Sequence, residues 1–254
     1  MIADALARAG IATLRYDDRG FSGYKGNIND CTTEDFKNDA LAGVELLRTC
    51  FDKVGVIGHS EGGTIALMLA AEQKVDFVVS LAGMVISGAE TLVWQNKVAL
   101  QGSGLTNEQI DSYCKMLEKA FDVRAHGGRM PDPDDYDVPE VLMQNYWAVV
   151  AQIQMPYMIH FLRLDMRPLL GNITCPVLAL NGTKDIQVEH ESNLSALRNT
   201  LPSNSKNLIE SVDGVNHLFQ HCKTGAVTEY RDIEETISPA VLETIINWIS
   251  RIQS

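Results

Sequence analysis

The sequence predicts an α/β protein built on an open, mostly parallel sheet with helices on its faces. Three short runs, KVGVIG (53–58), FVVSLAG (77–83) and PVLALNG (176–182), are too apolar for surface strands. They fit strands that are buried on both faces, as in parallel sheets. Helical patterns alternate with these runs, which is typical of a parallel sheet whose functional residues lie at the carboxyl ends of the strands.

One more strand is predicted near the start of the chain. The run ADALARAG (3–10) ends a helix at Gly10, a residue suited to the left-handed backbone after a helix. IATLRYD (11–17) then predicts a strand, and a glycine-punctuated loop follows over 17–27. Thr32 and Asp35 suit the capping arrangement at the start of a helix over 33–49. Its apolar residues recur at helical spacing.

From residue 88 to residue 171 the strand pattern disappears and helical patterns take over. Thr106 and Gln109 form a capping box ahead of an amphipathic helix. A polar, proline-bearing linker over 127–140 separates it from further helical runs. We therefore expect an all-helical cap insertion over 88–171, inside a core made of residues 1–87 and 172–254.

The strand pattern returns after this insertion. PVLALNG is followed by NLIESV (207–212), which predicts another strand. Ser238 and Pro239 suit the N-cap and first position of a final helix, and apolar residues at helical spacing supply its buried face.

Composition excludes several classes of function. The formal net charge is −12 over 254 residues, which argues against binding to nucleic-acid phosphates. No apolar run approaches the roughly 18 residues of a membrane span, and the first ten residues lack the layout of a signal peptide. We expect a cytoplasmic protein with no membrane span and with reduced thiols, because its five cysteines are far apart and form no C-x-x-C pair. They are Cys31, Cys50, Cys114, Cys175 and Cys222.

The stretch from Gly58 to Gly62 (GHSEG) matches the G-x-S-x-G nucleophile elbow. Such a turn forces the serine backbone into an unfavourable conformation, so bulky residues two positions to either side would clash. Here the motif lies between a buried strand and a helix, which is the context that it requires. We predict that Ser60 is a nucleophile and that the backbone N–H of Glu61 is an oxyanion donor.

A serine hydroxyl needs a base, and the base needs an orienting carboxylate. Asp185 lies in the loop after one predicted strand and His217 in the loop after the next, in the order serine, acid, histidine. Asp213 is nearer to His217 along the chain, but we expect it to shape the turn with Gly214. His59 should point into the structure.

A metal site would be the alternative use of His217. His217 and His221 have i, i+4 spacing, which could bind zinc on a helix, but no acidic third ligand is patterned beside them. We therefore expect neither a metal nor another cofactor.

Several stretches resemble α/β-hydrolases, and within that fold bacterial serine esterases: RYDDRGFSGYKG, GHSEGG, NGTKD and VNHLFQ. The resemblance covers nearly the whole chain, with the helical insertion as the cap. It implies Ser60 as nucleophile, Asp185 as acid and His217 as base. Asp18-Arg19-Gly20 resembles the loop after the fourth strand of that fold, where we expect the charged pair to brace the loop.

The resemblance breaks down at the amino terminus. Members of the family begin with about three more strands, and the loop after the third supplies a second oxyanion N–H. We expect these strands to be absent here and activity to fall roughly 10²–10³-fold without that donor. The chain could be incomplete, which we favour, and the missing part could have carried a signal. Alternatively, residues 11–17 could pair directly with 53–58, or a second copy could complete the sheet as a homodimer.

The leading hypothesis is a serine hydrolase that cleaves small-molecule carboxylic esters through an acyl-enzyme. A peptidase or amidase with the same triad is one alternative, although no obvious carboxylate cluster is present to hold a peptide amino terminus. A catalytically idle interaction protein on the same scaffold is another. We expect aromatic and methionine side chains of the cap to supply an apolar acyl pocket: Tyr146, Trp147, Met155, Tyr157, Met158 and Phe161.

Overall fold

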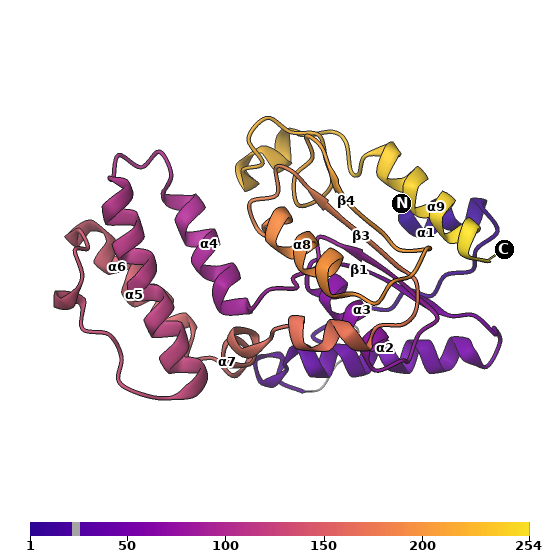
Figure 1. Cartoon of the computed structure of the whole chain (residues 1–254), viewed down its shortest axis with the longest axis horizontal. Coiled ribbons are helices and arrows are strands. Elements are labelled where there is room, and N and C mark those ends of the chain that lie inside the picture. The colour runs from indigo at the N-terminus through magenta and orange to yellow at the C-terminus, as the bar shows by residue number, and fades with distance from the viewer. Residues whose placement is uncertain (22–25, 254) are drawn as a thin grey trace.

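The computed structural model describes residues 1–21 and 26–253 and contains a four-stranded parallel sheet (Figure 1). Its strands lie in the order β1-β2-β3-β4. They are β1 (Gly55–His59), β2 (Phe77–Leu81), β3 (Val177–Gly182) and β4 (Leu208–Val212). The four strands predicted over 53–58, 77–83, 176–182 and 207–212 are thereby confirmed, as is the α/β class.

Burial along the strands explains why their sequences are so apolar. Every residue of β2 and β3 is buried, because both strands have a neighbour on each side and helices above and below. In β1, Gly55 lies opposite Phe77, and an added Cβ would fall 2.3 Å from the Phe77 ring. A side chain at this position would force the buried Phe77 ring to move.

Helices cover both faces of the sheet (Figure 1). Helices α2 (Thr33–Arg48), α3 (Glu61–Ala71) and α8 (His190–Thr200) share one apolar cluster with one face of the strands. Helices α1 (Ile2–Arg8) and α9 (Pro239–Gln253) share a second cluster with the other face. The sheet is thus the middle layer of three.

Residues 88–171, the helical segment, contain no strand and are all described. They form α4 (Gly88–Leu100), α5 (Asn107–His126), α6 (Met143–Gln152) and α7 (Pro156–Arg163). These helices pack around an apolar cluster of their own. In Figure 1, α4, α5 and α6 stand to one side of the sheet, and α7 leads back to the core, where it contacts α2.

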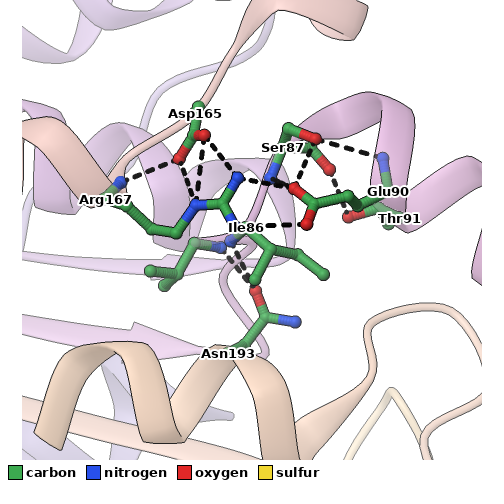
Figure 2. A network of polar contacts seen from close by, with 8 residues as sticks. Ile86, Ser87, Glu90, Thr91, Asp165, Arg167 and Asn193 are labelled. Carbon is green, nitrogen blue, oxygen red and sulfur yellow. Dashed lines mark hydrogen bonds and ion pairs between the residues drawn. The ribbon is translucent and has the colours of Figure 1, made fainter. Parts of the chain in front are cut away.

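Figure 2 shows the root of this segment, where the chain leaves the core before α4 and returns after α7. The Asn193 Oδ1 atom in α8 accepts hydrogen bonds from the backbone N–H groups of Val85 and Ile86, at 2.6 and 3.1 Å. Arg167, where the chain returns to the core after α7, donates to Glu90 in α4 (2.6 Å) and to Asp165 (2.6 Å). The guanidinium therefore ties the outgoing and returning crossings together.

The strand predicted over residues 11–17 does not form. Leu14 and Tyr16 are exposed, and their side chains lie over Gly43 of α2. A strand needs a neighbour to pair with its N–H and C=O groups, and in the described part of the chain β1 pairs only with β2. The alternative in which residues 11–17 pair with 53–58 is therefore wrong as well.

Arg19 binds α2. Its Nη2 donates to Asp39 at 2.8 Å and its Nη1 to Asp35 at 3.3 Å, so the ion pairs run to the helix. Residues 22–25 of the glycine-punctuated loop lie outside the described residues. The capping contact at Thr32 is confirmed, because its backbone N–H donates to Asp35 at 2.9 Å.

The described residues contain no helix that is long and apolar enough to span a bilayer. Cys50, Cys114, Cys175 and Cys222 are free thiols in the part of the chain that the structure describes.

Candidate active site

Ser60 lies at the sharp turn between β1 and α3. Its backbone has φ 56° and ψ −122°, a conformation that L-residues adopt at an energetic cost. A Cβ at Gly58 would fall 1.9 Å from the carbonyl oxygen of Gly62, so Gly58 is obligatory. Gly62 itself has open space around its Cβ position, and the close approach is instead at Gly63, whose Cβ would meet Gly83 at 2.9 Å. The expected clash therefore holds for the first glycine and not for the second.

The carboxyl ends of three strands bring the candidate catalytic residues to one edge of the sheet. Ser60 directly follows β1, Asp185 follows β3 and His217 follows β4. Since the strands are parallel, their carboxyl ends share an edge. The Ser60 N–H donates to Leu81 O at 2.8 Å, which fastens the elbow to the end of β2.

Asp185 and His217 form a buried pair. The His217 Nδ1 atom donates to Asp185 Oδ2 at 2.7 Å, and the two side chains are 6% and 0% exposed. The other carboxylate oxygen, Oδ1, accepts the backbone N–H groups of Gln187 (2.8 Å) and Val188 (2.9 Å). These contacts fix the carboxylate and assign the hydrogen of the ring to Nδ1. His217 Nε2 is left as the atom that can accept a proton.

No hydrogen bond joins Ser60 Oγ to His217 among the residues that the structure describes. In serine hydrolases without a bound substrate, such catalytic contacts are often long and tighten in the complex.

Asp213 has a different role from Asp185. Its Oδ1 accepts the hydroxyl of Thr183 at 3.1 Å, and the same hydroxyl oxygen accepts the N–H of Gly214 at 2.9 Å. Asp213 thus shapes the turn after β4, as the sequence predicted. His221 pairs with Glu235, with Nδ1 2.9 Å from Oε2. Within residues 1–21 and 26–253, no group of three metal-ligating side chains is assembled.

His59 supports the backbone of His217. Its Nε2 donates to the carbonyl oxygen of His217 at 2.7 Å, and the two ring centroids are 4.7 Å apart. Burial lowers the pKa of His59, although the hydrogen bond to His217 opposes this shift. The lowered pKa favours the neutral form of His59. The residue is nevertheless exposed, although its ring nitrogen reaches the loop after β4, so the expectation that it points into the structure is wrong.

Glu61 begins α3, so its backbone N–H is among the first four of the helix, which have no intrahelical acceptor. This N–H is the expected oxyanion donor. The carboxylate of Glu61 is held on both oxygens: Oε1 accepts the Thr33 hydroxyl at 2.7 Å and Oε2 accepts the Tyr157 hydroxyl at 3.0 Å. No sequence pattern predicts these contacts, because the partners lie 28 and 96 positions away.

The six residues expected to line an acyl pocket divide into four groups. Tyr146 is fully buried and Met158 is 7% exposed, both inside the core of the helical segment, so neither faces a pocket. Trp147 and Met155 are exposed to solvent. Phe161 packs against both apolar clusters that meet at α7. Only Tyr157 bonds to the elbow, so the other five serve packing or face water in this conformation.

Comparison with known families identifies the fold. The family model described as "Serine aminopeptidase, S33" matches residues 1–221. The chain belongs to this α/β-hydrolase family. A search of curated proteins by sequence gave no significant match.

Solved α/β-hydrolase structures share the fold at low sequence identity. One is a putative non-heme bromoperoxidase, BpoC, from Mycobacterium tuberculosis (18% identity, TM-score 0.55, covering 99% of this chain and 85% of that one). A monoacylglycerol lipase from Paleococcus ferrophilus matches with 18% identity and TM-score 0.53, covering 97% and 88%. Est1E from Butyrivibrio proteoclasticus, solved with ferulic acid, matches with 18% identity and TM-score 0.50, covering 98% and 82%. At such identities the likeness establishes the fold alone.

Proposed function

We propose that this hydrolase cleaves carboxylic esters through an acyl-enzyme intermediate formed on Ser60. The observation that carries the proposal is the strained backbone of Ser60 at the same sheet edge as the buried Asp185–His217 pair. Strain of this kind persists only where the surroundings enforce it, and it recurs at nucleophile elbows. The names of two structural neighbours, a lipase and a ferulate-bound Est1E, favour an ester substrate.

Each residue has a defined part in the reaction. His217 Nε2 accepts the proton of Ser60 Oγ as that oxygen attacks the ester carbonyl. The carboxylate of Asp185, 2.7 Å from Nδ1, stabilises the imidazolium that forms. The N–H of Glu61 donates to the oxyanion of the tetrahedral intermediate, and the start of α3 favours negative charge there. The imidazolium then protonates the departing alcohol, and a water molecule activated by the same ring releases the acid.

We assign the helical segment the part of a cap over this edge. Helix α7 contacts α2, and Tyr157 reaches Glu61 beside the nucleophile. In this proposal residues 1–87 and 172–254 form the catalytic core and 88–171 control access to it.

An aminopeptidase is the second candidate, since the matching family model carries that description. It would use the same triad on an amide. The two candidates differ in the leaving group. Rates of hydrolysis of aminoacyl p-nitroanilides and of p-nitrophenyl esters with the same acyl group therefore distinguish them: an aminopeptidase cleaves the anilides, and an esterase cleaves only the esters.

Labelling with a fluorophosphonate probe tests the common step. We expect the chain to be labelled, Ser60→Ala to lose the label, and Ser103→Ala, a control at an exposed serine, to keep it. Hydrolysis of p-nitrophenyl acetate should follow the same pattern. An unlabelled wild-type protein that also leaves esters and anilides intact would instead support an idle scaffold and exclude the proposal.

A further inference from the structure

Glu61 is the point at which the helical segment touches the nucleophile elbow. Its two carboxylate oxygens have separate partners: the hydroxyl of Thr33, the first residue of α2, at 2.7 Å and that of Tyr157, in the first turn of α7, at 3.0 Å. One partner belongs to the core and the other to the helical segment. The carboxylate therefore joins three helices at the residue that follows Ser60.

The surroundings of this junction are tightly packed. Thr33 is fully buried and Tyr157 is half-buried. The Tyr157 ring stacks on Phe161, with centroids 6.1 Å apart and an angle of 25° between the rings. The carbonyl oxygen of Phe161 lies only 2.0 Å from where a Cβ on Gly88 would be. The packing of α7 against the start of α4 thus helps to set the position of Tyr157.

The Tyr157 hydroxyl remains a donor over the whole working range of pH. Burial raises the pKa of Tyr157 above its ordinary value, and the charge of Glu61 and the hydrogen bond to it raise the pKa further. Hydrogen bonds between a neutral donor and a carboxylate are stronger than neutral pairs. The contact is therefore a firm connection between the segment and the elbow.

We propose that Tyr157 is a positioning residue that acts through Glu61 on the oxyanion-binding N–H. With both oxygens held, the side chain of Glu61 cannot rotate, and the first turn of α3 is fixed relative to α2 and α7. Loss of the contact to Tyr157 releases one oxygen, so the amide of Glu61 is less well aligned in the transition state. The catalytic consequence rests on the function proposed above, whereas the mechanical connection does not.

Two readouts test the proposal in the intact chain. Hydrogen–deuterium exchange of a peptide over residues 60–64 reports on the elbow without any reaction. The kcat and KM for p-nitrophenyl acetate report on the transition state. Tyr157→Phe removes only the hydroxyl. Its matched control is Tyr113→Phe, which removes a buried hydroxyl that accepts a hydrogen bond from Asn145 inside the helical segment and does not touch the core.

We expect Tyr157→Phe to exchange faster over 60–64 and to lower kcat about tenfold, the size of one charge-assisted hydrogen bond, with KM changed less than about twofold. Tyr113→Phe should do neither. In Glu61→Ala, which keeps the backbone N–H, the further change Tyr157→Phe should have no added effect, because both variants remove the same connection.

Exchange over 60–64 that matches wild type in Tyr157→Phe overturns the proposal, as does an equal change in Tyr113→Phe. Independent effects of Tyr157→Phe and Glu61→Ala on kcat also overturn it. If the wild-type chain neither hydrolyses esters nor takes the fluorophosphonate label, the proposed function fails, and the exchange comparison alone decides whether Tyr157 holds the elbow.

Discussion

Replacing Asp185 by asparagine tests the catalytic proposal most sharply, because the structure fixes how the new side chain would lie. Asp185 Oδ1 accepts two backbone N–H groups, from Gln187 and Val188. An asparagine keeps these bonds only if its oxygen takes the Oδ1 position. Its NH₂ group then faces His217 Nδ1 at the place of the 2.7 Å contact.

This orientation reverses the tautomer of the imidazole. Since the asparagine NH₂ can only donate, Nδ1 must accept, and the ring hydrogen moves to Nε2. Nε2 then cannot take the proton of Ser60, and no carboxylate stabilises the imidazolium. In a serine protease triad the same replacement lowers kcat roughly 10⁴-fold, which corresponds to about 5.5 kcal/mol of transition-state stabilisation. We expect a loss of roughly 10³–10⁴-fold here.

The assay is the steady-state hydrolysis of p-nitrophenyl acetate at pH 7.5. Circular dichroism and thermal unfolding of both proteins should agree closely, because the two hydrogen bonds at Oδ1 are kept. Asp213→Asn is the control, since Asp213 bonds to Thr183 and shapes the turn. The reasoning is refuted if Asp185→Asn retains more than a tenth of the wild-type kcat, or if Asp213→Asn loses as much.

Two further predictions concern the supports of the site. Arg167→Ala removes the ion pairs to Glu90 and Asp165, which are partly exposed, so we expect a loss of only about 1 kcal/mol in unfolding free energy. Limited proteolysis within residues 88–171 should become faster, and unchanged cleavage would contradict the assigned link. Burial lowers the pKa of His59 in the folded chain, whereas a histidine in the unfolded chain titrates at about 6.5. The unfolded chain therefore binds a proton at this imidazole more readily than the folded chain does. The stability from neutral His59 is therefore present above about pH 6.5 and lost below it. Between pH 7.5 and 5.5, the unfolding free energy measured in urea should fall less for His59→Gln than for wild type. Equal falls would disprove a stabilising role of neutral His59.

The core of the fold was predictable because its signals are local. Each buried strand is a short apolar run. The predicted caps at Thr32 and Thr106 each have their partner three residues away: Asp35 accepts the N–H of Thr32, and the Thr106 hydroxyl accepts the N–H of Gln109. Residues 11–17 show the limit of this approach. Their alternation of apolar and polar residues fits a strand, but a strand exists only where a neighbour offers hydrogen bonds, and here Leu14 and Tyr16 lie over Gly43 of α2.

The candidate site divides in the same way. Gly58, Ser60 and the order of Asp185 and His217 could be read from the sequence, because an elbow has a strict local requirement and parallel strands bring their following loops to one edge. The roles of the six residues expected to line an acyl pocket could not be predicted in this way. Helical aromatics and methionines such as Tyr146 and Met158 look alike whether they line a pocket or fill a core, and only tertiary packing decides between the two.

The connection between Thr33, Glu61 and Tyr157 bears on how the two parts of the molecule work together. The elbow obtains its strain from backbone close approaches within the core, as at Gly58, and these do not depend on the helical segment. The side chain of Glu61, in contrast, is held in part by that segment. The backbone strain at Ser60 therefore comes from the core, whereas the alignment of the Glu61 amide depends in part on the helical segment. Under the proposed mechanism, a movement of the segment would leave Ser60 in place and loosen the Glu61 amide, so kcat should depend on the position of the segment even where labelling of Ser60 does not.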